Sequence, residues 1–179
     1  VDLRSIGDRS SLAVEPLPSH DIFVACRPDH LLAGRRRLTA SAVFSFPTAS
    51  TPVLGDAVRA VESAGDAAGK IDPETRDFVP AIHVNSQAIA RQIAAGTDAV
   101  VPGTASMLAQ DLKSGRLVTI DFHTPAMRTH YGIIHHKHRT LSPPAQAFIE
   151  CLRSVESEVV AAEANAPPAA RKGGRSRRR

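Results

Sequence analysis

Aromatic side chains are scarce in this sequence, which contains six Phe, one Tyr and no Trp among 179 residues. A hydrophobic core therefore has to be built mostly from Val, Ile, Leu and Ala. Long apolar runs are missing as well, and a membrane-spanning helix would need about 20 consecutive apolar residues. The composition, with 42% hydrophobic and 22% charged residues, is typical of a globular protein with one domain or two small lobes.

Cysteine is almost absent. Cys26 and Cys151 are the two that occur, and they are far apart, whereas a disulfide framework would need more cysteines at closer spacing. We therefore expect free thiols in a reducing cytoplasm. A redox-sensing pair is an alternative, but two small buried apolar side chains are the simpler interpretation.

The chain starts with neither Met nor the charged and then apolar segment of a signal peptide. Residues 1–6 are predicted to be the middle of a strand, so we expect this chain to be a fragment of a longer protein. Six of the 22 basic residues lie in 171–179; the other 16 face 18 acidic residues, a formal charge of −2. Residues 163–179 are predicted to be a disordered basic tail, either solvated or touching nucleic-acid phosphates without reading bases.

Short apolar runs alternate with helix signals between these ends. Helices are expected at residues 52–61, 87–96, 105–114 and 143–161, and strands at 22–26, 43–46, 78–84, 99–101, 116–122 and 129–136. This alternation predicts an α/β fold with a largely parallel sheet.

The helix starts have recognisable caps. Thr51 and Pro52 are typical of an N-cap and a first helical residue, and so are Ser142 and Pro143. The last helix should carry one apolar stripe that packs on a sheet, formed by Phe148, Ile149, Leu152, Val155 and Val159.

Three stretches resemble the effector-binding domain of LysR-type transcriptional regulators. Pro16-Leu17 with residues 22–33 is similar to the family's crossing segment, and residues 141–153 are similar to its closing helix. Residues 86–122 contain Ile-Ala-Ala-Gly, then Val-Val-Pro, then Leu-Lys-Ser-Gly-Arg-Leu-Val in the family's order and spacing. Two positions depart from the pattern: Leu31 replaces a Pro, and Asp98 replaces a Gly beside the family's ligand cleft.

The resemblance implies a fold like that of type 2 periplasmic binding proteins, in which two α/β lobes are joined by two crossing strands. Residues 23–137 would form the second lobe completely. The first lobe would be partial, represented by residues 1–22 and by the hinge return and closing helix at 138–162. The family's helix-turn-helix head would be absent.

The strongest candidate for effector binding is the loop at residues 47–51. Thr48, Ser50 and Thr51 bring three hydroxyls to a predicted helix N-terminus, where unpaired N–H groups and the helix dipole favour an anion. The alternative is that Thr51 only caps the helix and that the other hydroxyls are solvated.

In a fold of this family, further loops would flank the same cleft, because ligands of α/β sheets bind at the C-terminal ends of strands. The resemblance places Ser86, the turn Gly96-Thr97-Asp98, and Pro102 there. Plain capping is the alternative for Ser86. The implied ligand is a small anionic metabolite.

Metal binding and catalysis have weak signals. His136 and His138 would share one strand face, but no Cys, Asp or Glu lies nearby in sequence to complete a tetrahedral site. A nucleophile elbow, a zinc-protease His pair and a Gly-rich phosphate loop are all missing. We therefore predict no metal, no cofactor, no catalytic residue and no enzyme.

The sequence as a whole predicts the effector-sensing part of a cytoplasmic LysR-type regulator. The resemblance implies a homo-oligomer in the intact protein, contact with DNA through the absent head, and no membrane contact. The alternative is a solute-binding protein of the same fold that serves a transporter.

Overall fold

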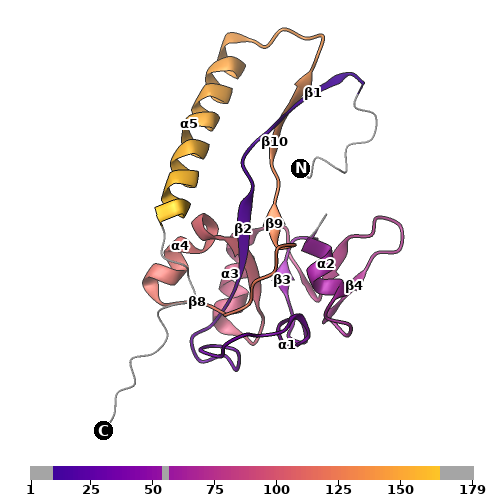
Figure 1. The fold of residues 1–179 in the computed structure, drawn as a ribbon, viewed down its shortest axis with the longest axis vertical. Helices are drawn as coiled ribbons and strands as arrows, with labels where there is room; N and C mark the ends of the chain where they lie inside the picture. Colours follow the sequence, from indigo (N-terminus) through magenta and orange to yellow (C-terminus); the bar gives the residue numbers. More distant parts are fainter. Residues whose placement is uncertain (1–9, 54–56, 166–179) are drawn as a thin grey trace. The chain divides into compact units, whose positions relative to one another are not determined.

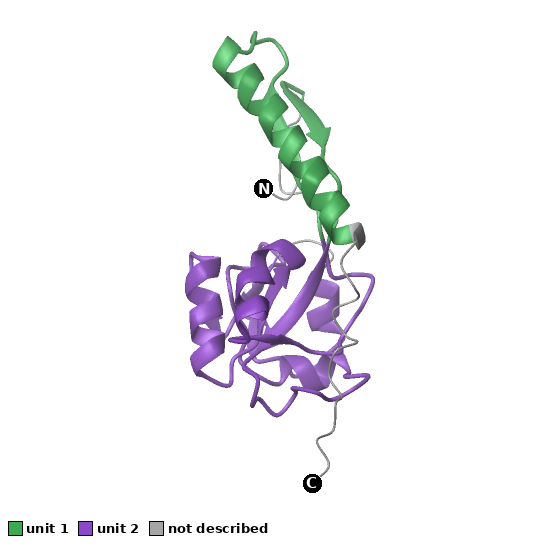
Figure 2. Ribbon diagram, turned by 90° about the vertical axis from the view of Figure 1, so that its left-hand side faces the viewer, with its two compact units in different colours: residues 1–20, 129–166 green, residues 21–128, 167–179 purple. Residues whose placement is uncertain are grey.

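The computed structural model describes residues 10–53 and 57–165, which form two compact units (Figures 1 and 2). Unit 1 holds the described residues up to His20 and from Thr129 onward, and unit 2 holds those from Asp21 to Arg128. Residues 129–137, expected with the second lobe, therefore group with unit 1. The strand expected within residues 1–6 and the tail from 166 onward lie outside the described residues. No helix in the described ranges is long and apolar enough to cross a membrane.

Unit 1 is a two-stranded ribbon with one long helix beside it (Figure 2). Strand β1 (Leu12–Pro16) pairs antiparallel with β10 (Gly132–His136). Helix α5 (Pro143–Asn165) starts as expected, because the Ser142 hydroxyl accepts a hydrogen bond from the Ala145 N–H at 3.4 Å. It extends beyond the expected end at residue 161. Arg153 on α5 and Glu15 on β1 form a two-pronged ion pair, with N–O distances of 2.8 and 2.6 Å.

The predicted apolar stripe of α5 is only partly covered by the two-stranded ribbon of unit 1. Ile149, Leu152 and Val159 are half-buried, whereas Phe148 is 68% and Val155 is 49% exposed. The ribbon of β1 and β10 has two strands, and it is too narrow to cover all five side chains of the stripe.

Unit 2 is organised around strand β2, which begins at His20 and ends at Cys26 (Figure 1). It pairs antiparallel with β7 (Val101–Thr104) and β8 (Val118–Thr119), and β9 (Arg128–Thr129) also pairs with it. Strands β3 (Ala49–Ser50) and β6 (Ile82–His83) are parallel. Strands β4 (Gly69–Ile71) and β5 (Phe78–Pro80) form an antiparallel pair. The sheet is mixed, so the expectation of a largely parallel sheet was wrong.

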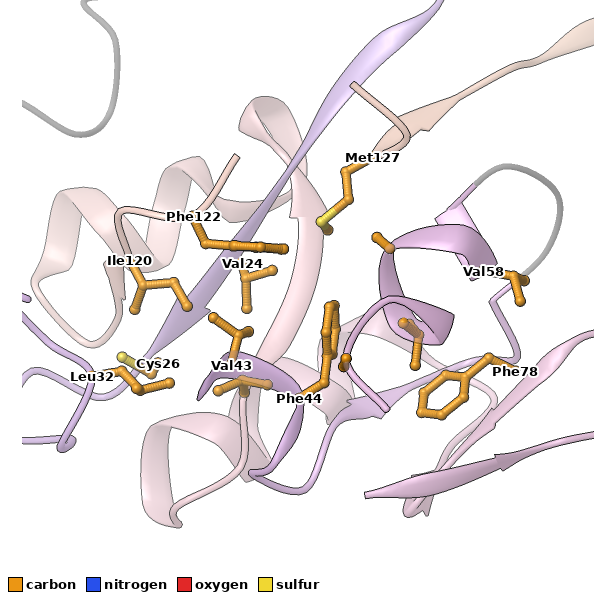
Figure 3. Packing of buried hydrophobic residues seen from close by; sticks show 14 residues of the cluster. Val24, Cys26, Leu32, Val43, Phe44, Val58, Phe78, Ile120, Phe122 and Met127 are labelled. Atoms are coloured by element: carbon orange, nitrogen blue, oxygen red, sulfur yellow. The ribbon is translucent and has the colours of Figure 1, made fainter. Parts of the chain in front are cut away.

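Two hydrophobic clusters lie on opposite faces of β2, because successive strand side chains point to opposite sides. Ala25 packs with α3 (Gln87–Gly96) and α4 (Ala105–Ser114), which contribute Ala90, Ala94 and Leu108. Val24 and Cys26 pack on the other side with α1 (Ala40–Phe44) and α2 (Ala57–Glu62). Figure 3 shows this second cluster, from Leu32 and Ile120 to Phe78. The result is a three-layer α/β/α unit.

The two cysteines differ in their surroundings. Both are free; Cys26 is buried and Cys151 is exposed. Burial raises the pKa of the Cys26 thiol to about 11, so this side chain behaves as a small apolar residue. The interpretation as a buried apolar residue holds for Cys26 and was wrong for Cys151.

Two segments have a different secondary structure from the one predicted. Residues 43–46 were expected to be a strand, but Val43 and Phe44 belong to helix α1, because Thr39 caps it by accepting from the Ala42 N–H at 3.2 Å. A short apolar run does not distinguish a strand from a buried helix. The helix expected from Thr51 does not start there, since Val53 instead forms a bridge with Phe78.

The remaining elements occur close to where they were expected. Helices α3 and α4 have the predicted bounds, and strand β2 covers residues 22–26. The strand expected at 78–84 is divided into β5, which ends at Pro80, and β6. The strands expected at 99–101, 116–122 and 129–136 are displaced, shortened or divided.

Gly115 ends α4 in a backbone conformation that favours glycine, with φ of 73°. A Cβ at Gly115 would meet nothing within 4 Å, so Gly115→Ala introduces backbone strain alone. We expect this substitution to lower the free energy of unfolding by about 1–2 kcal/mol, measured by urea denaturation. Gly96→Ala is the matched control, because Gly96 also has open space but no positive φ. Equal losses for the two variants would contradict this account.

Candidate functional site

Three strands of unit 2 run in the same direction. Strands β3 and β6 are parallel, with Ala49 opposite Ile82, and a parallel bridge between Thr48 and Val100 joins β3 to the segment that leads into β7. The Ala49 N–H donates to the Val100 carbonyl at 2.9 Å, and the Val100 N–H donates to the Pro47 carbonyl at 2.8 Å. The segments that follow β3, β6 and β7 therefore lie at one edge of the sheet.

We call this edge the carboxyl edge and define it by Thr51, Ser86 and residues 104–106. Helix α3 starts directly after Ser86, and α4 starts directly after Thr104. Each of these helices has 10 residues, and the first turn of a helix presents unpaired N–H groups and the positive end of its dipole. The carboxyl edge therefore carries two helix N-termini together with several hydroxyls.

The caps of the two helices differ. Thr104 Oγ1 accepts from the Met107 N–H at 3.4 Å and lies 2.9 Å from Ser106 Oγ. Ser86 is extended, and its hydroxyl makes no capping hydrogen bond; its carbonyl accepts from the Ala90 N–H. Capping therefore accounts for Thr104 but not for Ser86, and the first turn of α3 lacks a side-chain cap. Ser106 was not among the residues that the sequence predicted for effector binding.

An ion pair lies where β2 enters unit 2. Ile22 is opposite Thr104, so the start of β2 belongs to the same edge. The Arg128 Nε lies 3.0 Å from the Asp21 Oδ1, and both side chains are about half exposed, at 48% and 47%. Arg128 is thus a cation at the carboxyl edge. No sequence signal marked it, because its proximity to β2 arises only from the pairing of β9 with β2.

Three of the predicted contact residues lie within the sheet. Thr48 and Ser50 are both 1% exposed. The Ser50 hydroxyl donates to the Thr51 carbonyl at 2.7 Å, and Thr48 Oγ1 is buried without a hydrogen-bond partner among the described residues. Pro102 lies in β7 opposite Val24. Of the first predicted loop, only Thr51 reaches the end of the strand.

The turn Gly96-Thr97-Asp98 lies at the opposite edge, because it precedes β7 rather than following it. The Arg27 Nη2 donates to the Asp98 Oδ1 at 2.8 Å, and the His30 Nε2 donates to the Asp98 carbonyl at 3.2 Å. Arg27 follows the last residue of β2, which is antiparallel to β7. The structure therefore does not bring this turn together with Thr51 and Ser86.

The carboxyl edge supplies hydrogen-bond donors and the Arg128–Asp21 ion pair. Within residues 10–53 and 57–165, no group of three or more His, Cys, Asp and Glu is arranged to hold a metal ion. The His135 Nδ1 donates to the carbonyl of His136 at 3.2 Å. The chemistry available at the edge is recognition of a small anionic or polar group.

The chain matches the model of a known protein family. The profile described as "LysR substrate binding domain" matches residues 3–157. A curated relative, the SDS degradation transcriptional activation protein of Pseudomonas sp. (strain ATCC 19151), is 29% identical over 152 residues. The match covers 82% of this chain and 46% of that protein, so the chain spans about half the length of the relative.

Several solved structures have folds similar to that of this chain. OxyR from Corynebacterium glutamicum has a TM-score of 0.63 at 18% identity, covering 94% of this chain and 51% of that chain. The regulatory domain of CcmR from Synechocystis PCC6803, solved in complex with 2-PG, has a TM-score of 0.59 at 17% identity, covering 85% and 71%. The regulatory domain of MetR from N. meningitidis has a TM-score of 0.58 at 15% identity, covering 87% and 70%. These similarities show the type 2 periplasmic-binding-protein-like fold.

Proposed function

This chain belongs to the LysR substrate binding domain family, and we propose that it is the effector-sensing part of a DNA-binding transcriptional regulator. The family consists of regulator domains rather than enzymes, and we propose that this chain likewise has no catalytic residue. Neither the matching family nor the relatives favour the alternative of a solute-binding protein for a transporter. We further propose that the intact protein is a cytoplasmic homo-oligomer that contacts DNA through a segment outside this chain.

The effector of the proposed sensor is a small anion bound at the carboxyl edge. The observation that carries this proposal is the convergence of two helix N-termini at that edge, one of which has no side-chain cap. An anion can accept hydrogen bonds from the free N–H groups of the first turn of α3 and from the Ser86 and Ser106 hydroxyls. The Arg128 guanidinium lies at the same edge, where it is half exposed and paired with Asp21.

Thr48 supports the proposal in a different way. A buried hydroxyl without a partner costs about 1–3 kcal/mol, and the Thr48 Oγ1 is such a group. Thr48 therefore stays a proposed effector contact, together with its neighbours Ser50 and Thr51. The turn Gly96-Thr97-Asp98 is not included, because it lies at the opposite edge. Pro102 is not included either, because proline has neither a backbone N–H nor a polar side-chain group with which to bind an anion.

An anion titration monitored by NMR tests this site. We expect hexanoate and hexyl sulfate to shift the backbone amide signals of residues 86–88 and 104–106 in ¹⁵N-labelled protein, because these amides lie at the two helix starts. Hexanol is the matched control, since it has the same alkyl chain without the charge.

The same titration separates the two edges of the sheet. Amide signals of Gly96, Thr97 and Asp98 should not respond to either anion. Shifts confined to this turn, or equal shifts with hexanol and hexanoate, would overturn the proposed anion site. Absence of any response to either anion would also contradict it.

A further inference from the structure

A buried histidine, His20, lies against helix α5 within unit 1. His20 is 4% exposed, and both of its ring nitrogens meet a glutamate of α5. The Nε2 lies 2.6 Å from the Glu156 Oε1, and the Nδ1 lies 2.7 Å from the Glu163 Oε2. These distances are at the short end of the range for charge-assisted hydrogen bonds.

The geometry favours a doubly protonated His20. An ionised carboxylate can only accept hydrogen bonds, so two ionised carboxylates at the two ring nitrogens require a proton on each nitrogen. Both hydrogen bonds and both glutamate charges are satisfied together when His20 is an imidazolium. A neutral ring has only one N–H, and would direct the lone pair of its other nitrogen at a carboxylate oxygen.

The other groups around His20 do not compensate for loss of its charge. The ring of Tyr131 lies nearby, with the ring centroids 6.1 Å apart, and it carries no positive charge. The Glu163 Oε1 is buried without a hydrogen-bond partner among the described residues, so the bond from His20 is what stabilises this carboxylate. Nearby charges are engaged elsewhere: Glu15 with Arg153, and Asp21 with Arg128.

The cluster of His20, Glu156 and Glu163 contacts only the C-terminal half of α5. Glu156 and Glu163 lie two turns apart on the C-terminal half of the helix, whereas Arg153 holds an earlier turn to β1. His20 is the first residue of β2, the strand that continues into unit 2. The charge on one ring therefore determines how the C-terminal half of α5 is attached to the strand that connects the two units.

We propose that His20, Glu156 and Glu163 form a proton-dependent clamp that holds the C-terminal half of α5 at the start of β2 and releases it when the imidazole ring loses one of its two protons. The clamp is a conformational device built into the proposed sensor, and it does not depend on the anion site of the carboxyl edge.

The direction of the pH dependence follows from the pKa of His20. Burial alone would lower this pKa, but the hydrogen bonds and charges of Glu163 and Glu156 outweigh burial, so the pKa lies above its usual value of 6.5. A raised folded-state pKa means that the clamp contributes fully below the unfolded-state pKa. Its contribution is lost as the pH rises through the folded-state pKa.

Two measurements on the full chain test the clamp. The imidazole ¹⁵N signals of His20, assigned by their loss in His20→Gln, should titrate with a pKa above that of exposed histidines. Hydrogen exchange of residues 156–165, corrected for the intrinsic pH dependence of exchange, should accelerate over the same pH range. Glu156→Gln and Glu163→Gln should each move both midpoints to lower pH, by about one unit or more.

Matched controls are available in the same unit. Glu158 is exposed on α5 and His136 is exposed on β10, so Glu158→Gln and His136→Gln should leave both midpoints unchanged. The clamp is refuted if residues 156–165 exchange independently of pH in the unaltered chain, or if Glu158→Gln shifts the midpoint as much as Glu163→Gln. A His20 pKa at or below that of exposed histidines in the unaltered chain also refutes it, whether or not the variants fold.

Discussion

Asp111→Asn should lower the free energy of unfolding of this protein by about 3–5 kcal/mol, because it removes one partner of a buried ion pair. Asp111 is 2% exposed within α4. Its Oδ2 accepts from the Arg91 Nε of α3 at 2.7 Å, and its Oδ1 accepts from the Arg116 Nε at 2.9 Å. The substitution leaves Arg91, which is only 21% exposed, without a countercharge.

Asp98→Asn is the control for this substitution. Asp98 also pairs with an arginine, Arg27, but Asp98 is 62% exposed, so water can replace the lost partner. We expect urea denaturation to give nearly unchanged stability for Asp98→Asn. Similar losses for both variants would show that burial of the Asp111 pair is not the cause.

The Asp111 pair also makes the protein sensitive to acid. Burial alone would raise the pKa of Asp111, but the hydrogen bonds and charges of Arg116 and Arg91 outweigh burial and lower it. The stabilisation is therefore present above the unfolded-state pKa of about 3.9 and is lost as the pH falls through the lower folded-state value. Stability should fall less steeply with acid in Asp111→Asn than in the unaltered chain.

Phe78→Ala should have a comparably large effect, a loss of about 3–5 kcal/mol in the free energy of unfolding. Phe78 is 1% exposed in the cluster of Figure 3. Its backbone also exchanges two hydrogen bonds with Val53, at 2.9 and 3.0 Å. Removing the ring leaves a cavity next to Gly69, where a Cβ would lie only 2.5 Å from the Phe78 Cζ.

Leu31→Ala is the control for this substitution, because Leu31 is an apolar residue of unit 2 whose side chain is 65% exposed. Its substitution should change the free energy of unfolding by less than about 0.5 kcal/mol. Thermal or urea denaturation followed by circular dichroism measures both variants. A small effect of Phe78→Ala would mean that the cluster around β5 contributes little to the cooperative unfolding of the unit.

Helix boundaries with local chemical signals could be predicted from the sequence. Thr104 and Ser142 cap α4 and α5 through their own hydroxyls, and Gly115 ends α4 through its own backbone conformation. These interactions span only a few residues, so the sequence contains all the information they need. Residues 43–46 were different, because a short apolar run fits a strand and a buried helix equally well.

The candidate site could be predicted only in part. Ser86 was expected directly before a helix, and α3 starts after it, since helix-start signals are local. Thr51 was expected to cap a helix, but it follows strand β3 instead. The sequence could not indicate that Gly96-Thr97-Asp98 lies at the opposite edge, because that depends on the direction in which β7 runs relative to β3. This direction is set by the bridge between Thr48 and Val100, which are far apart in the sequence.

The sequence by itself determined the family, the α/β class, and the bounds of helices α3 and α4. These follow from hydrophobic periodicity and short motifs, which are properties of neighbouring residues. Only the tertiary structure decided which loops share an edge of the sheet, that Arg128 reaches Asp21, and that His20 meets Glu156 and Glu163. Those proximities join residues up to 143 positions apart, and they arise from strand pairing and helix packing, for which a linear pattern contains no local signal.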